Sequence, residues 1–270
     1  MKESKRLGMS GPKSYKPKPL TIDDAYTFLN RGPLFRFLCG AFRRFAYCIL
    51  RVYNRLFFDL RVTGREYLRG IDGGAVTICN HVNLLDCTFV ACHCGKKKPW
   101  FPTLKSNLEI PFIRRLVEYL GGFPIPETPR AFRSFSLKIE EMLNEGEWVH
   151  LFPEGELIPY CRELRPFHRG AFNYACRCQV PVIPFVVTYR QNTGLRRLLR
   201  RQSALDLTIL PPVYPRAEGG RAETLRLMDR CRQEMQDRID FGSGIHRRIE
   251  EAGGELIRTA VETEERQAVS

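Results

Sequence analysis

A histidine and an aspartate stand five positions apart at the end of an apolar run. The run Ala75 to Cys79 is followed by Asn80 and His81, and Asp86 comes five residues after the histidine. An imidazole with one nitrogen held by a carboxylate can use its other nitrogen to remove a proton from a substrate. Because a regular helix has about 3.6 residues per turn, the two side chains meet only if His81 precedes the helix and folds back. The chain has five histidines, and such an offset also arises by chance, so the pair alone is a weak indication of catalysis.

The segments around this pair have the pattern of a strand followed by a helix. Residues 75–79 are uncharged, contain β-branched side chains and follow two glycines, which predicts a short strand buried on both faces. The apolar segment from Val82 to about Cys94 predicts a helix packed on the sheet, with Asn80 or Asn83 available to cap its first turn. His81 is therefore expected at the turn between the strand and the helix.

A second carboxylate, Glu154, follows another apolar run. Residues 148–152 predict a core strand that stops at a Pro-Glu-Gly-Glu segment. Ligand sites of parallel sheets lie outside the carboxyl ends of the strands. We therefore expect His81 and Glu154 to open into one crevice.

The rest of the chain alternates between strand and helix patterns. Further strands are predicted at residues 59–62, 100–104, 181–189 and 205–210, and helices at 105–120, 130–145, 170–178 and 224–239. The breaker-rich residues 121–129 predict a loop, and residues 196–201 a basic turn. This alternation indicates an α/β fold with a mixed, largely parallel sheet flanked by helices.

The first sixty residues differ in composition from the rest. Residues 1–20 carry several lysines and an arginine against one glutamate, which predicts a disordered basic tail. Residues 21–58 are rich in Phe, Leu and Tyr, interrupted by arginines, and predict an amphipathic helix or helix pair in the membrane interface. An ordinary helix packed on the domain with exposed arginines is the alternative. The core domain is expected at residues 59–215, and a helix with a polar tail at 216–270.

Composition and charge narrow the classes of partner. A chain of 270 residues that is 43% hydrophobic can bury a full core. The net charge of +13 calls for an anionic partner, which could be nucleic acid, an anionic membrane surface or a phosphorylated substrate. Nucleic acid is disfavoured because the basic residues form no recognisable binding module. No apolar run approaches the ~20 residues of a spanning helix, and no signal peptide is evident, so the protein is expected to stay where it is made.

Two other kinds of chemistry are disfavoured. The ten cysteines are scattered through apolar or helical contexts without C-x-x-C spacing, which predicts reduced, buried thiols and no metal site. A serine hydrolase is disfavoured because no G-x-S-x-G is present.

Four short motifs, taken in order, resemble those of the glycerolipid acyltransferases, typified by 1-acylglycerol-3-phosphate O-acyltransferase. The matches are Asn80, His81 and Asp86 to N-H-x-x-x-x-D; residues 152–155 to F-P-E-G; Phe167, Gly170 and Ala171 to F-x-x-G-A; and residues 180–184 to V-P-V-I-P. Their order and spacing agree over about residues 60–215, so the chain is identified as a member of this family and residues 59–215 as its acyltransferase domain.

The resemblance implies transfer of an acyl group from acyl-CoA or acyl carrier protein to the hydroxyl of a lysophospholipid, with 1-acylglycerol-3-phosphate as the leading acceptor. It implies no cofactor. It also implies a peripheral or monotopic membrane protein that lies on the cytoplasmic face of the membrane and binds an anionic membrane surface. His81 would remove the acceptor's proton and Asp86 would orient the imidazole, without an acyl-enzyme. The expected substrate-binding residues are Asn80, Glu154 and Gly155, with Lys105, Arg130, Arg165, His168 and Arg169 as candidates for holding phosphate.

Two positions depart from the family pattern. The second block normally ends in an arginine that holds the acceptor phosphate, whereas Glu127 stands here, with Arg130 or Arg133 as possible substitutes. F-P-E-G is usually followed by Thr-Arg, and Glu156 and Leu157 replace them. An acceptor with another head group, or a non-phosphate polar lipid, is therefore the alternative. A catalytically silent lipid-binding protein is disfavoured because His81, Asp86 and Glu154 are all present.

Overall fold

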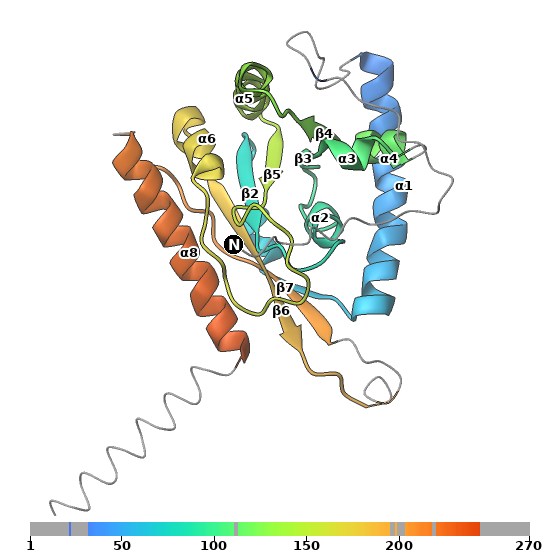
Figure 1. Ribbon diagram of the computed structural model, residues 1–270. Coiled ribbons are helices and arrows are strands. Elements are labelled where there is room, and N and C mark those ends of the chain that lie inside the picture. The colour runs from blue at the N-terminus through green and yellow to red at the C-terminus, as the bar shows by residue number, and fades with distance from the viewer. Residues whose placement is uncertain are drawn as a thin grey trace, which may run out of the picture.

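A computed structural model describes residues 22, 32–110, 113–194, 198, 203–217 and 220–243 (Figure 1). The predicted basic tail, most of the basic turn at 196–201 and the polar tail after residue 243 lie outside the described residues. The chain forms a five-stranded sheet of order β1-β7-β6-β2-β5 and a two-stranded sheet of β3 and β4.

The five-stranded sheet is mixed and largely parallel, as predicted. Its strands are β1 (Arg61–Thr63), β2 (Ala75–Cys79), β5 (Trp148–Leu151), β6 (Val182–Arg190) and β7 (Ala204–Ile209). β2 pairs in parallel with both β5 and β6, β1 pairs in parallel with β7, and only β6 and β7 are antiparallel. β2 and β5 therefore end at the same edge of the sheet, where ligands of parallel sheets bind.

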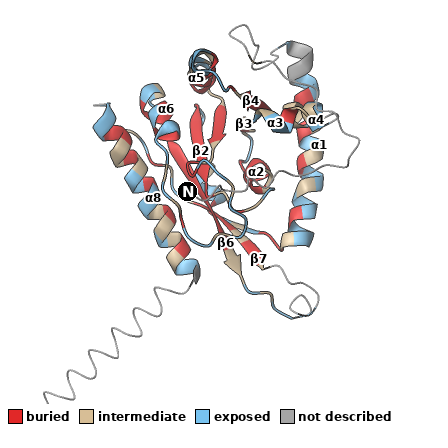
Figure 2. Cartoon of the chain, in the orientation of Figure 1, coloured by how far each residue is buried: buried red, intermediate tan, exposed pale blue. Residues whose placement is uncertain are grey.

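Helices cover both faces of this sheet. The helices of the described residues are α1 (Pro33–Phe58), the 3-10 helix η1 (Arg65–Leu68), α2 (Asp86–Ala91), α3 (Lys105–Leu108), α4 (Ile113–Leu120), α5 (Pro129–Asn144), α6 (Gly170–Cys178) and α8 (Arg221–Ser243). Figure 1 shows α6 and α8 on one side of the sheet, and α2 with α1 beyond it on the other. All five residues of β2 are buried (Figure 2), which confirms the prediction of a strand buried on both faces.

Three predicted elements differ from the structure. The expected loop at 121–129 contains strand β4 (Gly122–Ile125), which pairs in parallel with β3 (Phe101–Leu104). Each of these strands contains a proline, which a two-stranded sheet tolerates because many of its backbone N–H groups have no ladder partner. The helix expected at 105–120 is split into α3 and α4, and the helix expected from Val82 begins only at Asp86. Of the helix or helix pair expected at 21–58, the described residues 33–58 form one helix, α1.

Helix α1 buries two polar side chains, Arg43 and Asn54, together with Cys39 and Tyr47, and it exposes many large apolar side chains on its other face. Arg43 is 4% exposed, donates from Nε to the Tyr119 carbonyl at 3.0 Å, and lies 4.2 Å from the centre of the Trp100 ring. Asn54 is also fully buried. The large apolar side chains exposed on the other face are Phe37, Leu38, Phe45, Ile49, Val52, Tyr53, Leu56 and Phe57. Within the described part of the chain, no helix has the length and hydropathy needed to span a membrane.

Candidate active site

The turn after β2 is organised by the side chain of Asp86. Asp86 Oδ2 accepts hydrogen bonds from the backbone N–H groups of Val82 at 2.7 Å and Asn83 at 2.8 Å. A carboxylate that binds N–H groups ahead of a helix satisfies donors that would otherwise lack partners. The predicted cap by Asn80 or Asn83 is therefore wrong: α2 begins after Leu85 without a side-chain cap, and Asn83 Oδ1 instead accepts from the Leu85 N–H at 2.9 Å.

His81 folds back onto Asp86, as the sequence predicted for this pair. Its Nδ1 lies 3.2 Å from Asp86 Oδ2. The Asp86 side chain is completely buried, whereas 21% of the His81 side chain is exposed. With Nδ1 directed at the carboxylate, Nε2 is the nitrogen left to take a proton from a substrate.

The carboxyl group of Asp86 is held in an environment that opposes its charge. Burial raises its pKa, and the hydrogen bonds from His81, Asn83 and Val82 act in the opposite direction. Among the described residues, Oδ1 has no hydrogen-bond partner. Because the hydrogen bonds reach only Oδ2, burying this carboxylate costs folding free energy.

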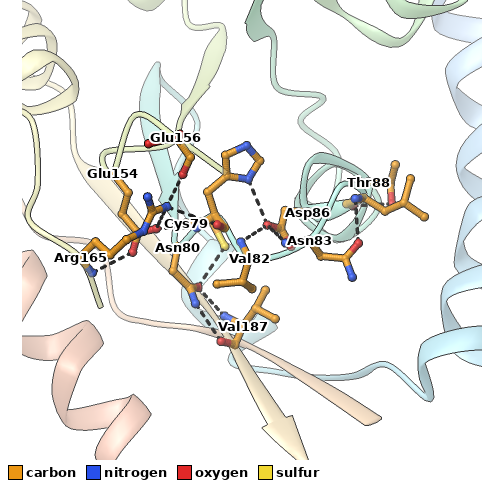
Figure 3. A network of polar contacts seen from close by, with 12 residues as sticks. Cys79, Asn80, Val82, Asn83, Asp86, Thr88, Glu154, Glu156, Arg165 and Val187 are labelled. Atoms are coloured by element: carbon orange, nitrogen blue, oxygen red, sulfur yellow. Dashed lines mark hydrogen bonds and ion pairs between the residues drawn. The ribbon is translucent and has the colours of Figure 1, made fainter. Parts of the chain in front are cut away.

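Asn80 is a structural part of the site. It is 3% exposed. Its amide group forms two hydrogen bonds with the backbone of Val187 on β6, donating to the carbonyl at 2.9 Å and accepting from the N–H at 2.8 Å (Figure 3). These bonds fix the end of β2 against β6, and the predicted contact of Asn80 with substrate stays a prediction.

Glu154 and Arg165, which follow β5 in the chain, form hydrogen bonds with the backbone of His81 in the turn after β2. Glu154 lies just beyond β5, with its side chain fully buried. It accepts hydrogen bonds from the His81 N–H at 3.0 Å and the Arg165 N–H at 3.2 Å, and Arg165 Nη2 lies 2.7 Å from its Oε2. The same nitrogen also contacts the carbonyls of His81 and Glu156 (Figure 3). The structure thus brings His81 and Glu154 together, as expected from the parallel strands.

Two aromatic contacts beside His81 were not foreseen from the sequence. The Phe152 ring stacks on the His81 imidazole with centroids 3.8 Å apart and planes at 12°. His150 on β5 meets Phe152 edge to face at 4.6 Å, and its Nδ1 is 2.9 Å from Thr77 Oγ1. Burial and the nearby His81 lower the pKa of His150 to about 3. A histidine inside an apolar strand was the only sequence signal for this arrangement.

The other predicted phosphate ligands lie around this cluster or away from it. Gly155 has a positive φ of 73°, and a Cβ there would come within 2.9 Å of the His168 ring. His168 and Arg169 are exposed, and the latter precedes α6. Lys105 instead lies at the start of α3, 3.5 Å from Glu127 and 3.8 Å from Glu109. Arg130 is exposed near the start of α5.

The described residues contain no cluster of three or more histidine, cysteine, aspartate or glutamate side chains that could hold a metal ion. The polar side chains that contact His81 are the carboxylates of Asp86 and Glu154 and the guanidinium of Arg165. This set is suited to holding an imidazole base and moving one proton.

Comparisons with known proteins identify the family to which the chain belongs. Residues 59–188 match the family described as Acyltransferase. The chain is 31% identical over 172 residues to a 1-acyl-sn-glycerol-3-phosphate acyltransferase of Salmonella typhimurium, covering 62% of this chain and 67% of the relative. It is 26% identical over 191 residues to the enzyme of that name from Pseudomonas aeruginosa, covering 70% and 71%. The crystal structure of PlsC, the 1-acyl-sn-glycerophosphate acyltransferase of Thermotoga maritima, has the same fold, with a TM-score of 0.52 and 21% identity over 79% of this chain and 83% of that one. The chain therefore belongs to the glycerolipid acyltransferase family and is an O-acyltransferase.

Proposed function

We propose that the protein transfers a fatty acyl group from acyl-CoA or acyl carrier protein to the hydroxyl of 1-acylglycerol-3-phosphate, with His81 as general base. The observation that carries this proposal is the 3.2 Å contact between His81 Nδ1 and the buried Asp86 carboxylate at the end of β2. The relatives named above are acyltransferases for this acceptor, and the chain shares their family.

The proposed reaction moves one proton through His81. Nε2 takes the proton of the acceptor hydroxyl while its oxygen attacks the thioester carbonyl carbon. The tetrahedral intermediate then expels the thiol sulfur, which receives the proton from the imidazolium. Asp86 accepts the Nδ1–H throughout, so it fixes the tautomer and stabilises the cation. A base of this kind contributes about 10²–10⁴-fold in rate.

Glu154 and Arg165 are proposed to act by positioning His81. Both oxygens of Glu154 accept hydrogen bonds within the protein, and its side chain is fully buried. Arg165 donates hydrogen bonds from one guanidinium nitrogen, Nη2, to the Glu154 carboxylate and to the His81 and Glu156 carbonyls. These contacts hold the backbone on either side of the imidazole, and binding of the acceptor phosphate by Arg165 would have to use its remaining nitrogens.

The acceptor's head group is the least determined part of the proposal. Glu127 occupies the position where the family motif has a phosphate-binding arginine, and its carboxylate lies 3.5 Å from Lys105 Nζ. A lysine paired in this way has part of its charge neutralised. A lysophospholipid with a different head group, or a non-phosphate polar lipid, is therefore the alternative acceptor.

The protein is proposed to work as a peripheral or monotopic protein on the cytoplasmic face of a membrane, with α1 in the interface. The outward face of α1 combines exposed apolar side chains such as Phe45 and Ile49 with exposed arginines such as Arg44 and Arg55. A contiguous apolar face of this kind on a basic helix is the signature of an interfacial anchor. Its position beside α2 would place the acceptor's bilayer next to the site.

The proposal is tested by acyl transfer in anionic vesicles. Purified protein, one acyl-CoA and a panel of acceptors are incubated, and free thiol and acylated lipid are both measured. We expect thiol and product in equal amounts with 1-acylglycerol-3-phosphate and a loss of about 10²–10⁴-fold in His81→Ala. Equal rates in wild type and His81→Ala would refute the role of the histidine. Transfer only to other acceptors would support the alternative.

A further inference from the structure

The stack of His81 on Phe152 has an unusual geometry for two neutral rings. Aromatic rings in proteins prefer offset or edge-to-face arrangements with centroids about 4.5–7 Å apart, because the negative faces of two rings repel each other. The two centroids here are 3.8 Å apart, with the planes only 12° from parallel. The imidazole therefore lies almost directly over the face of the phenyl ring.

This arrangement becomes favourable when the imidazole carries a positive charge. The face of a phenyl ring attracts cations that lie within about 6 Å of its centroid. In the proposed reaction His81 is neutral before it takes the acceptor's proton and cationic afterwards. Contact with the Phe152 face thus discriminates between the two states in the direction that assists proton abstraction.

We propose that Phe152 is a positioning residue that uses its ring face to stabilise the His81 imidazolium formed when the acceptor hydroxyl is deprotonated. The inference rests on the proposed role of His81 as the base. Asp86 Oδ2 holds the edge of the imidazole, 3.2 Å from Nδ1. The Phe152 ring covers the face of the imidazole, with the two ring centroids 3.8 Å apart. Together they define both the plane and the rotation of the ring.

The other ionisable groups around this stack are consistent with such a role. The His150 ring packs edge to face against Phe152 at 4.6 Å, and its lowered pKa of about 3 keeps it neutral in the range where the enzyme would be assayed. It therefore adds no competing positive charge behind the phenyl ring. Glu154 and Arg165 face the backbone of His81, where they form an ion pair at 2.7 Å with each other.

The test replaces Phe152 by phenylalanine carrying one, two and three ring fluorines, which weaken the negative face and keep the shape. Histidine-labelled protein is titrated by NMR, with the His81 signals assigned through His81→Gln, and kcat/KM is measured against pH in the same samples. Loss of the ring face makes protonation of His81 less favourable, so its titration midpoint should fall stepwise. We expect a total fall of roughly half to one pH unit, and the acid limb of kcat/KM should move with it.

Two further variants complete the experiment. Phe152→Leu should shift the midpoint in the same direction as the fluorinated series. Trifluorinated phenylalanine at Phe132, which is exposed on α5, should leave it unchanged. A midpoint that stays constant through the fluorinated series would overturn the inference, even with normal acyl transfer. A stepwise shift in a protein without any transfer activity would instead refute the proposed function and leave the cation-stabilising contact established.

Discussion

The backbone N–H of His81 donates a hydrogen bond to the buried carboxylate of Glu154 at 3.0 Å. This bond joins the second residue beyond β2 to the turn after β5, and these segments are neighbours because the two strands pair in parallel. A shift of one strand relative to the other would move the imidazole away from its brace. Glu154 is itself held by Arg165, so three separate segments define where His81 stands.

The first prediction concerns the buried pair of Glu154 and Arg165. Arg165→Met leaves the fully buried Glu154 carboxylate without its cation, so the free energy of unfolding should fall by about 3–5 kcal/mol. The double variant Glu154→Gln with Arg165→Met removes the stranded charge and should recover most of this loss. Urea unfolding measures the stability of both variants.

The control is Arg177→Met, because the Arg177 side chain is 63% exposed where it pairs with Glu140. This variant should lower the free energy of unfolding by less than about 1 kcal/mol. An Arg165→Met protein of normal stability with only a raised KM would assign Arg165 to phosphate binding instead.

The second prediction separates stability from activity at Asp86. Burial raises the pKa of this carboxyl group, so its ionisation costs folding free energy at neutral pH. Asp86→Asn removes that cost and keeps an oxygen for the Val82 and Asn83 N–H groups. We expect a melting temperature equal to or above that of wild type, with acyl transfer reduced by about 10²–10⁴-fold. Asp237→Asn on the exposed face of α8 should change neither. A strongly destabilised but active Asp86→Asn would contradict the assignment.

The positions of the main strands could be predicted because each one is an apolar run bounded by breakers. β2 and β5 are short apolar runs buried on both faces, and their length and their flanking breakers indicate strands. β4 could not be predicted, since Gly122 and Pro124 weaken any strand pattern and only the partner strand β3 gives them a pairing role. The start of α2 was misplaced because a side chain inside the helix, Asp86, binds the N–H groups before it.

The sequence predicted two relationships in the candidate site, the pairing of His81 with Asp86 and the shared crevice of His81 and Glu154. His81 and Asp86 are five residues apart, and a single turn brings them together. The contacts of His81 with Glu154 and Phe152 span about seventy residues and depend on the register of β2 against β5, in which Ile78 faces Leu151. Register is set by packing of the whole sheet, and the sequence shows motifs at each strand end without showing which atoms touch.

The third prediction follows from two buried, neutral histidines. Burial lowers the pKa of His150 to about 3 and that of His93 to about 4, against an ordinary value of 6.5. Below pH 6.5 the unfolded chain binds these protons and the folded protein does not, so stability should fall as the pH falls toward 4. Each histidine contributes a slope of about 1.4 kcal/mol per pH unit. His150→Leu and His93→Leu should each remove one histidine's contribution to the slope of stability against pH. The double variant should remove both contributions. Slopes identical to wild type in urea titrations from pH 7 to 5 would show that these groups are not neutral in the fold.

The fourth prediction tests the outward face of α1. Phe45 is 66% exposed and Ile49 is 53% exposed on this face, and replacing both with serine removes apolar surface from the bilayer contact. Binding to anionic vesicles should weaken by about tenfold or more, measured by co-sedimentation. Phe241→Ser is the matched control, because this phenylalanine is 68% exposed on α8, and it should bind as wild type does. Equal weakening by both variants would indicate non-specific adsorption. Wild-type binding should also decline with salt if the arginines of α1 contact anionic lipid.

The fifth prediction concerns Glu127 and the choice of acceptor. Glu127→Arg places a cation where the family motif has its phosphate-binding arginine and also releases Lys105 from its 3.5 Å ion pair. A new charge-assisted contact to phosphate should lower the KM for 1-acylglycerol-3-phosphate by about tenfold, with little change for an acceptor without phosphate. Glu109→Arg is the control, since Glu109 lies 3.8 Å from the same lysine and changes the local charge equally. If both variants lower KM alike, the effect comes from overall charge or from freeing Lys105. If only Glu127→Arg does so, position 127 sets the head-group preference.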